Sequence, residues 1–469
     1  MYTVWLLGTL AVLSRCHGRV SNPPFPKIEL NTRHFAEKLF KKPVLRDTTK
    51  ISAELLASSV GVLTSAPIAL SRLHGVGPPL HGLFSSTNVV ALADFIPVYD
   101  YGRRNDDVHL SIDQLIVKYG YPLEEHRVVT DDRYLLTVFR IPRLGPPVLL
   151  VHGLEGSADD FVLAGPESGL AYLLADEGYD VWLGNARGNK HSRHHEHLKP
   201  TDGSFWDFSW HEIGLYDLPS MTDYILNKTG NEKVIYIGHS QGTTSFFVMA
   251  SLKPEYNNKT SAMIALSPVA FMTNVKSPLI RLLAPGGPLL HTITNNIGVQ
   301  ELFSDNVVLR ALRRVLCENS AMAAILCATN TMFLLGGFSF DHLNVTNLPV
   351  ILSHLPAGAA TKQFAHYGQG VVSTDFRQFD YGPRVNLERY GGEVPPSYPV
   401  HRITTHVSLL YSSADWLAHP SDVHRLSSNL PNVNIYPIRD DTFNHFDFLF
   451  AKDFKAIIYN RIRNILMAI

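Results

Sequence analysis

The sequence lacks a surplus of charge of either sign. Its 469 residues include 41 Lys and Arg against 42 Asp and Glu, a net charge of −1, and no long basic run is present. Proteins that bind nucleic acids rely on basic surfaces to neutralise phosphates. Nucleic acid is therefore not expected as a partner.

Long apolar runs are missing as well. The apolar stretch at residues 5–13 is well short of the ~20 residues that a membrane-spanning helix needs. It is followed by Cys16-His-Gly18, whose small first and third residues suit signal-peptide cleavage, although a positively charged start is absent. We expect residues 1–18 to be a signal peptide and the protein to be secreted, with no transmembrane anchor after cleavage.

Cysteine is scarce, with three in the whole chain. If Cys16 leaves with the signal peptide, Cys317 and Cys327 remain, and an even pair in an oxidising compartment predicts a disulfide. Candidate N-glycosylation sequons, which fit a secreted chain, begin at Asn227, Asn258 and Asn344.

Recognisable metal and phosphate motifs are absent too. The histidine-rich run from His191 to His197 has neither a His-Glu-x-x-His order nor a Cys-x-x-Cys pair, which indicates an ordinary loop. Gly153-x-x-Gly156 lacks the Lys-Ser/Thr of a phosphate-binding loop. We expect no metal and no cofactor.

Residues 19–105 differ in character from the rest of the chain. Pro and Gly are scattered through them, charges are few between residues 58 and 98, and no period persists. A poorly structured leader is expected there; a pro-segment cut near Arg103-Arg104 and a membrane-touching segment at 51–70 are the alternatives. Residues 106–469 are expected to form the ordered domain.

Helices and strands alternate after residue 106. The predicted elements are a helix at 112–119, strands at 125–129, 134–141, 147–151 and 179–183, and a helix at 169–177. The first two strands are close enough to form a hairpin. Alternation of the later strands with helices predicts an α/β fold around a mostly parallel sheet.

The centre of this pattern is Ser240. A buried strand is predicted at 234–237 and a helix at 241–252, and between them stands Gly238-x-Ser240-x-Gly242. Glycines on both sides permit a strained strand-to-helix turn that exposes the hydroxyl, and the helix N-terminus favours developing negative charge. This spacing predicts a nucleophile elbow.

A serine nucleophile requires a base and an acid, which follow such an elbow in the order acid, then His. Asp415 follows a predicted strand at 407–411, and His445 follows another at 433–436. Because α/β sheets place working side chains at the carboxyl ends of their strands, these two are the candidate acid and base. The rival carboxylates are Asp422, Asp440, Asp441 and Asp447, and the rival bases are His419 and His424.

Acyl transfer also requires donors for an oxyanion. One is expected to be the backbone N–H of Gln241, directly after the nucleophile. The other is expected from Leu154, because Gly153 allows a close turn after the strand at 147–151.

Further motifs extend the pattern from residue 108 to the C-terminus. They are Tyr119-Gly-Tyr-Pro122, His152-Gly-Leu154, Asn185-Ala-Arg-Gly-Asn189 with Ser192-Arg193, Phe205-Trp-Asp-Phe-Ser209, Tyr216-Asp-Leu-Pro219, Gly238-His-Ser-Gln-Gly242, Pro356-Ala-Gly358, Asp415-Trp-Leu-Ala418 and Asn444-His445. In this order they resemble the acid lipase family of animals, the gastric and lysosomal acid lipases and their insect relatives.

The resemblance implies an α/β-hydrolase fold: a mostly parallel central sheet with helices on both faces and a mainly helical cap. It also implies hydrolysis of lipid acyl esters at a lipid–water interface by Ser240, Asp415 and His445, with oxyanion amides at Leu154 and Gln241 and no cofactor. Secretion remains the expected localisation, with the lysosomal lumen as the alternative.

Ser240 and Asp415 are 175 positions apart, more than a minimal core requires, so a cap insertion is expected at about 271–375. By family resemblance, Cys317 and Cys327 would brace it. Two residues depart from the family pattern: Glu155 replaces an apolar residue beside the oxyanion loop, and His419 replaces an acidic one.

Three functional hypotheses follow. The first is a secreted lipase that cleaves triacylglycerol or steryl ester through an acyl-enzyme. The second is an amidase or thioesterase on the same core, because a triad does not choose its leaving group. The third is a non-catalytic, lipid-binding relative of the hydrolases.

Overall fold

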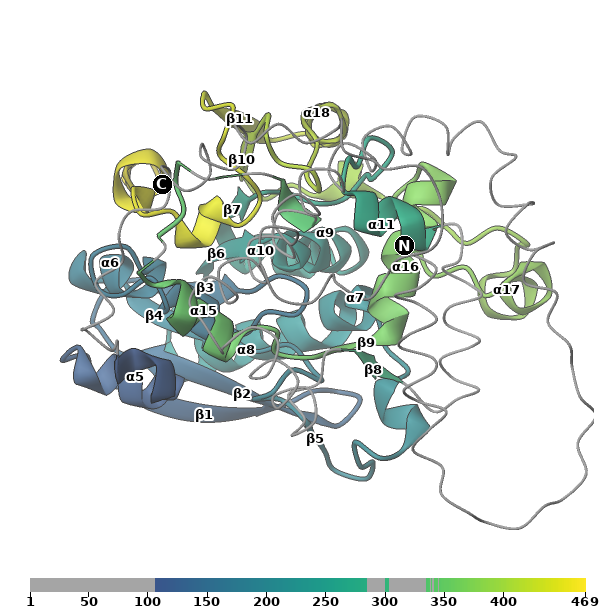
Figure 1. Ribbon diagram of the computed structural model, residues 1–469. Helices are drawn as coiled ribbons and strands as arrows, with labels where there is room; N and C mark the ends of the chain where they lie inside the picture. Colours follow the sequence, from purple (N-terminus) through teal and green to yellow (C-terminus); the bar gives the residue numbers. More distant parts are fainter. Residues whose placement is uncertain (1–105, 285–299, 303–334, 338, 340, 345) are drawn as a thin grey trace, which may run out of the picture. The chain divides into compact units, whose positions relative to one another are not determined.

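The computed structural model describes residues 106–284, 300–302, 335–337, 339, 341–344 and 346–469. These residues form a central β-sheet packed between helices (Figure 1). The predicted signal peptide and leader, Cys317 and Cys327 lie outside the described residues. The signal peptide, the leader and the disulfide therefore stay predictions.

The sheet has eight strands along its main path, and most of them are parallel. Their spatial order is β1 (Glu124–Val129), β2 (Tyr134–Ile141), β4 (Asp180–Gly184), β3 (Pro147–Val151), β6 (Val234–His239), β7 (Thr260–Leu266), β10 (Val407–Ser412) and β11 (Val433–Ile438). β1, β2 and β4 pair antiparallel, and every pairing from β4 to β11 is parallel. The short β5 (His194–His195) pairs with β2.

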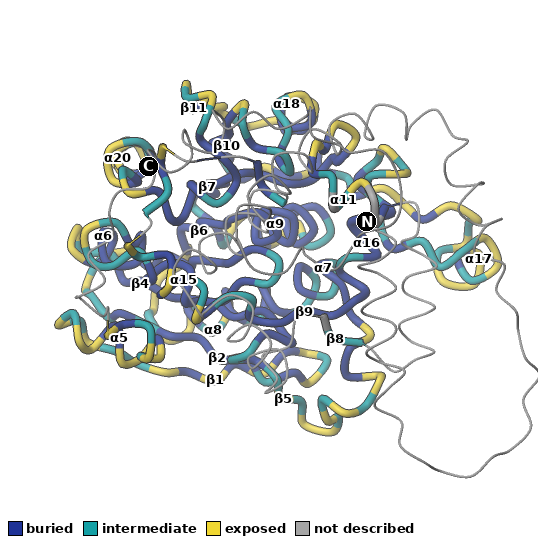
Figure 2. The backbone as a smooth tube through the Cα atoms, viewed as in Figure 1, coloured by how far each residue is buried: buried dark blue, intermediate teal, exposed yellow. Residues whose placement is uncertain are grey.

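The central strands are buried on both faces, which explains their unbroken apolar sequences. In β3, Leu149 and Val151 face one hydrophobic core, while Val148 and Leu150 face the other. The first core is covered by helices α7 (Trp210–Glu212), α8 (Leu218–Thr229), α9 (Gln241–Leu252), α10 (Glu255–Asn258) and α18 (Pro420–Asn429). The second is covered by α5 (Ile112–Lys118), α6 (Leu170–Asp176), α19 (Asp447–Phe450) and α20 (Asn460–Leu466). Figure 2 shows the sheet and α9 as the buried centre.

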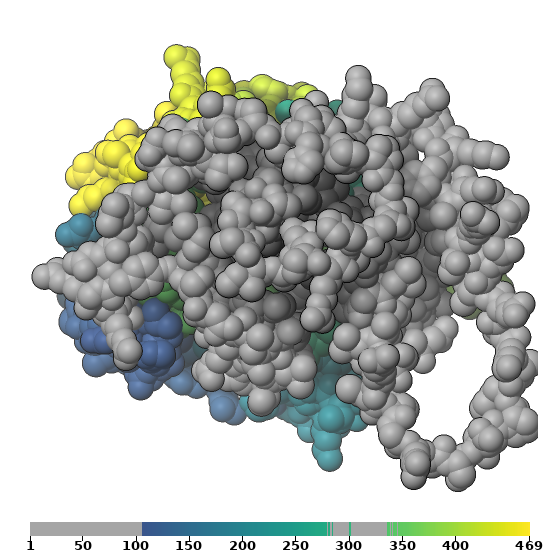
Figure 3. Space-filling view, in the orientation of Figure 1, coloured from purple at the N-terminus to yellow at the C-terminus, as the bar shows by residue number. Residues whose placement is uncertain are grey.

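The two ends of the described chain reach the same core. Ile112 and Leu115 of α5 pack in one cluster with Ile462 and Ile465 of α20. Both ends are visible at the surface in Figure 3, α5 in dark blue and the C-terminal residues in yellow. Residues near both ends of the described chain therefore contribute to one hydrophobic core.

Local patterns predicted these elements to within two residues at each end: α5, α6, α9, β1 to β4, β6, β10 and β11 all occur where expected. The prediction omitted β7. Its sequence, Thr260-Ser-Ala-Met-Ile-Ala-Leu266, has few β-branched residues, yet it lies fully within the sheet between β6 and β10.

Between β7 and β10 most of the regular elements among the described residues are helices. They include α11 (Pro278–Leu283), α15 (Leu348–His354), α16 (Thr361–Ser373) and α17 (Pro383–Tyr390), with β8 (Glu301–Leu302) and β9 (Ala359–Ala360) paired antiparallel. The predicted cap limits stay a prediction. In the described parts of the chain, no helix is both long and apolar enough to cross a bilayer.

Substitution of two glycines can test how tightly the helices pack around α9 and α16. Gly214 lies in a π-helical turn (Ile213–Asp217), where an added Cβ would stand 2.6 Å from the Ser245 carbonyl oxygen and 2.6 Å from the Val248 Cβ of α9. Gly214→Ala should therefore lower the free energy of unfolding by about 1–3 kcal/mol through overpacking.

Gly370 is the matched control in α16, because its nearest neighbour, the Met272 sulfur, would be 3.6 Å from an added Cβ. Gly370→Ala should raise stability by about 0.5–1 kcal/mol, since alanine restricts the unfolded chain. Chemical unfolding measures both changes. A Gly214→Ala protein as stable as wild type would contradict the packing account.

Candidate active site

The predicted residues gather at one edge of the sheet. After β3 the chain turns to β4 on one side, whereas β6 pairs with β3 on the other, so strand order reverses at the carboxyl ends of β3 and β6. Ligands of open α/β sheets bind outside such a switch point. Ser240 follows β6 there, while Asp415 and His445 follow β10 and β11.

Ser240 occupies a strained turn, as predicted. Its backbone has φ 50° and ψ −115°, and α9 begins at the next residue. A Cβ on Gly242 would lie 2.3 Å from the Val151 carbonyl oxygen, and one on Gly238 would lie 2.8 Å from the Gly242 carbonyl carbon. Both glycines are thus required by close backbone approach.

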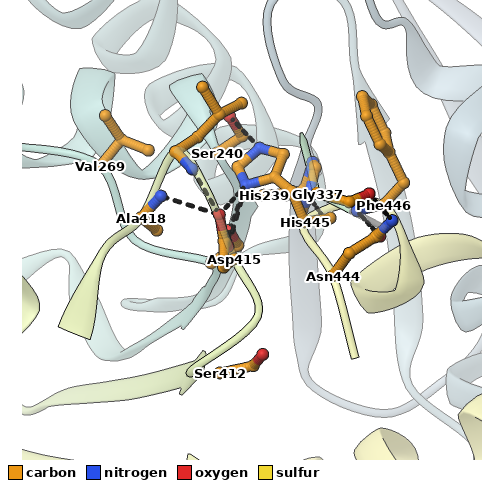
Figure 4. Close-up of polar contacts among 12 residues, drawn as sticks. His239, Ser240, Val269, Gly337, Ser412, Asp415, Ala418, Asn444, His445 and Phe446 are labelled. Atoms are coloured by element: carbon orange, nitrogen blue, oxygen red, sulfur yellow. Dashed lines mark hydrogen bonds and ion pairs between the residues drawn. The ribbon is translucent and has the colours of Figure 1, made fainter. Parts of the chain in front are cut away.

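The structure joins the three predicted catalytic side chains (Figure 4). The His445 Nε2 lies 2.8 Å from the Ser240 Oγ, and its Nδ1 lies 3.0 Å from each carboxylate oxygen of Asp415. The amides of Leu417 and Ala418 each donate to Asp415 Oδ1 at 2.8 Å. Serine, imidazole and carboxylate therefore form one hydrogen-bonded chain.

Asp415 is held in its ionised form. Burial alone would raise its pKa, but the charge interaction with His445 and hydrogen bonds from His445, Ser267 and the Ala418 amide hold the pKa below its ordinary value. An ionised carboxylate only accepts, so the His445 Nδ1 carries the proton. The Nε2 is then free to accept from the Ser240 hydroxyl.

The rival acids and bases are engaged elsewhere. Asp422 accepts from Asn274, and His424 contacts the Tyr411 hydroxyl. The remaining rivals also have local partners: Asp440 with Thr442 and His342, Asp441 with Ser413, Asp447 with Asn444, and His419 with the Ser421 amide.

The predicted oxyanion loop lies against the nucleophile. A Cβ on Gly153 would stand 3.1 Å from the Ser240 Cβ and 3.6 Å from its Oγ, so the loop carrying Leu154 packs directly beside the serine. The Nε2 of His152 accepts from the Ala186 amide. The Nδ1 of the same imidazole donates to the Gly153 carbonyl at 2.7 Å. Burial lowers the pKa of His152 to about 4, which keeps this imidazole neutral.

Two residues near the triad were missed by sequence reasoning. His239 donates from Nε2 to the His445 carbonyl at 3.0 Å, and burial lowers its pKa to about 3. Ser267 contacts both Asp415 and His445 through its hydroxyl. Ser267 directly follows β7, the omitted strand, so recognising that strand would have drawn attention to it.

The remaining predicted positions are the three sequon asparagines and the histidine-rich run. Asn227 in α8 and Asn258 in α10 are exposed and Asn344 is half-buried, and their glycosylation stays a prediction. In the histidine-rich run, His191 contacts Asp159 at 2.7 Å and His195 donates to the Asp132 carbonyl at 2.9 Å. The described residues contain no group of three or more acidic, His or Cys side chains arranged to hold a metal ion.

Known proteins are similar to this chain over most of its length. A family model for the alpha/beta hydrolase fold matches residues 146–291, and one for a partial alpha/beta-hydrolase lipase region matches residues 112–165. Lipase 1 of Drosophila melanogaster is 43% identical over 369 residues, covering 78% of this chain and 82% of the relative. Gastric triacylglycerol lipase of Mus musculus is 37% identical, covering 77% of this chain and 92% of the relative. The chain belongs to the acid lipase family. Both the predicted resemblance and the predicted α/β-hydrolase fold are thereby confirmed.

The arginine of the acid lipase motif Asn185-Ala-Arg-Gly-Asn189 holds neighbouring segments together. The Arg187 guanidinium is buried. Its Nε lies 2.7 Å from Asp217 Oδ1, and its Nη2 lies 2.8 Å from Asp132 Oδ1. The guanidinium carbon lies 4.1 Å from the Tyr134 ring centroid. Through these contacts the guanidinium holds the loop after β4 against the β1–β2 turn and the π-helical turn that precedes α8.

Glu155, one of the departures from the acid lipase pattern, joins the oxyanion loop to the insertion. Its φ is 62°, its carbonyl accepts from Ala357 at 2.7 Å, and its Oε2 accepts from Gly358 at 3.2 Å. It lines a small, partly open pocket together with Gln241 and Gln363. Burial, with a smaller contribution from the charge of Glu301, raises the pKa of Glu155 well above its ordinary value.

Glu155 should therefore make stability depend on pH. Because its folded-state pKa is raised, its contribution is fully present below the ordinary value of 4.5 and declines as pH rises toward the folded-state pKa. Glu155→Gln keeps the shape but does not titrate. Between about pH 5 and about pH 8, wild type should lose unfolding free energy relative to this variant.

Chemical unfolding at both pH values measures the difference, with Glu232→Gln as the control because Glu232 is exposed. The Glu232→Gln variant should follow wild type at both values. If Glu155→Gln also follows wild type at both pH values, the Glu155 carboxyl is already ionised in the folded protein and the prediction is wrong.

Proposed function

We propose that this acid lipase family member is a secreted, serine-dependent carboxylic ester hydrolase that cleaves acyl esters of neutral lipids, triacylglycerol or steryl ester. The observation that carries the proposal is the hydrogen-bonded chain from Ser240 through His445 to the buried Asp415. That chain stands at a nucleophile elbow beside a glycine loop, an arrangement suited to acyl transfer.

The first half-reaction forms an acyl-enzyme. The Ser240 Oγ attacks the ester carbonyl carbon while the His445 Nε2 takes the hydroxyl proton. Asp415 stabilises the resulting imidazolium through Nδ1–H. When the tetrahedral intermediate collapses, the bond to the alcohol oxygen breaks and His445 returns the proton to the leaving alcohol.

The second half-reaction releases the acid. Water attacks the acyl-enzyme as His445 removes one of its protons, and the Ser240 oxygen leaves with that proton. Negative charge on the former carbonyl oxygen develops in both halves. The N–H groups of Leu154 and Gln241 are the proposed donors to it, and Gln241 lies in the first turn of α9, whose dipole favours an anion.

The substrate class rests on the relatives and on the insertion. One relative in mouse is named gastric triacylglycerol lipase. The described helices between β7 and β10 are more than a minimal core requires and suit a cap over an acyl chain. The signal-peptide prediction supports secretion, with the lysosomal lumen as the alternative.

Variants of the three side chains test the chemistry. Ser240→Ala should lower kcat by roughly 10⁴- to 10⁶-fold and abolish labelling by a fluorophosphonate serine probe. Asp415→Asn should lower kcat by about 10⁴-fold, because the imidazolium loses its counter-charge. The measurement is hydrolysis of emulsified triacylglycerol, steryl ester and a short soluble ester.

Ser251→Ala is the control, since Ser251 is buried in α9 and donates to the Val248 carbonyl at 3.1 Å, away from the triad. It should keep wild-type kcat. Matched amide and thioester substrates separate the alternatives: faster cleavage of either would replace the lipase proposal, and a wild-type protein that the probe does not label would end the enzyme proposal.

A further inference from the structure

Ser267 occupies an unusual position in the fold. It follows β7 directly, its side chain is fully buried, and its backbone φ is +55°. Its amide donates to the Leu410 carbonyl of β10 at 2.9 Å. A non-glycine residue is disfavoured in this left-handed region and persists there only where surrounding contacts hold it.

Its hydroxyl contacts both polar partners of the nucleophile. The Ser267 Oγ is hydrogen-bonded to Asp415 Oδ2 and lies 2.5 Å from the His445 Nδ1. Since the ionised carboxylate only accepts, the hydroxyl proton points to Asp415. The lone pairs of the oxygen then face the Nδ1–H of His445.

We propose that Ser267 is a positioning residue that orients the Asp415 carboxylate and, through it, the imidazole of His445. The proposal rests on the proposed function, because it assigns Ser267 to the same triad. It adds a fourth side chain, from the strand between those that carry the nucleophile and the acid.

The orientation of the Asp415 carboxylate depends on Ser267 because its two oxygens have different donors. Oδ1 accepts from the amides of Leu417 and Ala418, so that oxygen is held from the backbone. Among the described residues, Oδ2 has donors in His445 and Ser267 alone. Without the hydroxyl, the imidazole would be the one remaining donor to that oxygen from the part of the chain that the structure describes.

The proton on His445 is also shared. Its Nδ1 lies 3.0 Å from both carboxylate oxygens and closer still to the Ser267 Oγ. Three acceptors around one N–H restrict rotation of the ring, which keeps Nε2 directed at the Ser240 Oγ. Such preorganisation matters because small misplacements of a catalytic base lower the rate strongly.

Two variants separate the hydroxyl from the backbone. Ser267→Ala removes the hydroxyl and keeps the strain, whereas Ser267→Gly removes the hydroxyl and fits φ +55° without strain. Both should lower kcat by roughly 10- to 100-fold, the range for losing one hydrogen bond to a charged group. KM should stay unchanged, since Ser267 acts through Asp415 and His445.

The readout is kcat per serine titrated with the fluorophosphonate probe, on a short soluble ester, so that misfolded protein is not counted. The low-field proton resonance of the His445 Nδ1–H should shift in both variants. Ser251→Ala, which removes another buried hydroxyl, should change neither quantity.

Opposite results overturn the proposal. If both variants keep kcat within about 2-fold of wild type, the hydroxyl does not position the triad. If Ser267→Gly recovers kcat while Ser267→Ala does not, backbone conformation is the cause. These outcomes are distinct from failure of the proposed function, in which the wild-type protein itself would neither hydrolyse esters nor react with the probe.

Discussion

An ionised carboxylate with no exposed surface, that of Asp415, is the constraint on which the site depends. A buried charge is tolerated only where donors surround it. Here the donors are the amides of Leu417 and Ala418 after β10, the ring of His445 after β11 and the hydroxyl of Ser267 after β7. Because these donors follow three different strands, the charge is stable only while the three neighbouring strands keep their parallel register.

Ser240 depends on equally close contacts where β3, β6 and α9 meet. Gly242 lets α9 approach β3, and Gly238 lets β6 approach α9, within distances that no Cβ allows. Two neutral imidazoles then tie the loops: His152 supports the oxyanion loop, and His239 donates to the backbone of His445. Burial keeps both uncharged, so their donor and acceptor nitrogens are fixed.

The described part of the insertion between β7 and β10 is bound to the catalytic loops at several points. Ala357 and Gly358 donate to Glu155 beside the oxyanion loop. The Gly336 carbonyl accepts from the amides of Trp416 and His445. The described part of the insertion therefore helps to shape the loops that carry Glu155, Trp416 and His445.

Local sequence determined the elbow, the order of nucleophile, acid and base, and most strands, because glycine spacing and apolar runs act over a few residues. Tertiary structure alone decided that Asp415 and His445, among their rivals, reach Ser240, since these contacts span up to 205 positions along the chain. It also decided the role of Ser267, which is 148 positions from Asp415 and follows a strand with a weak local pattern. Local patterns report the conformation of a segment, whereas burial and hydrogen-bond partners depend on which segments the sheet brings together.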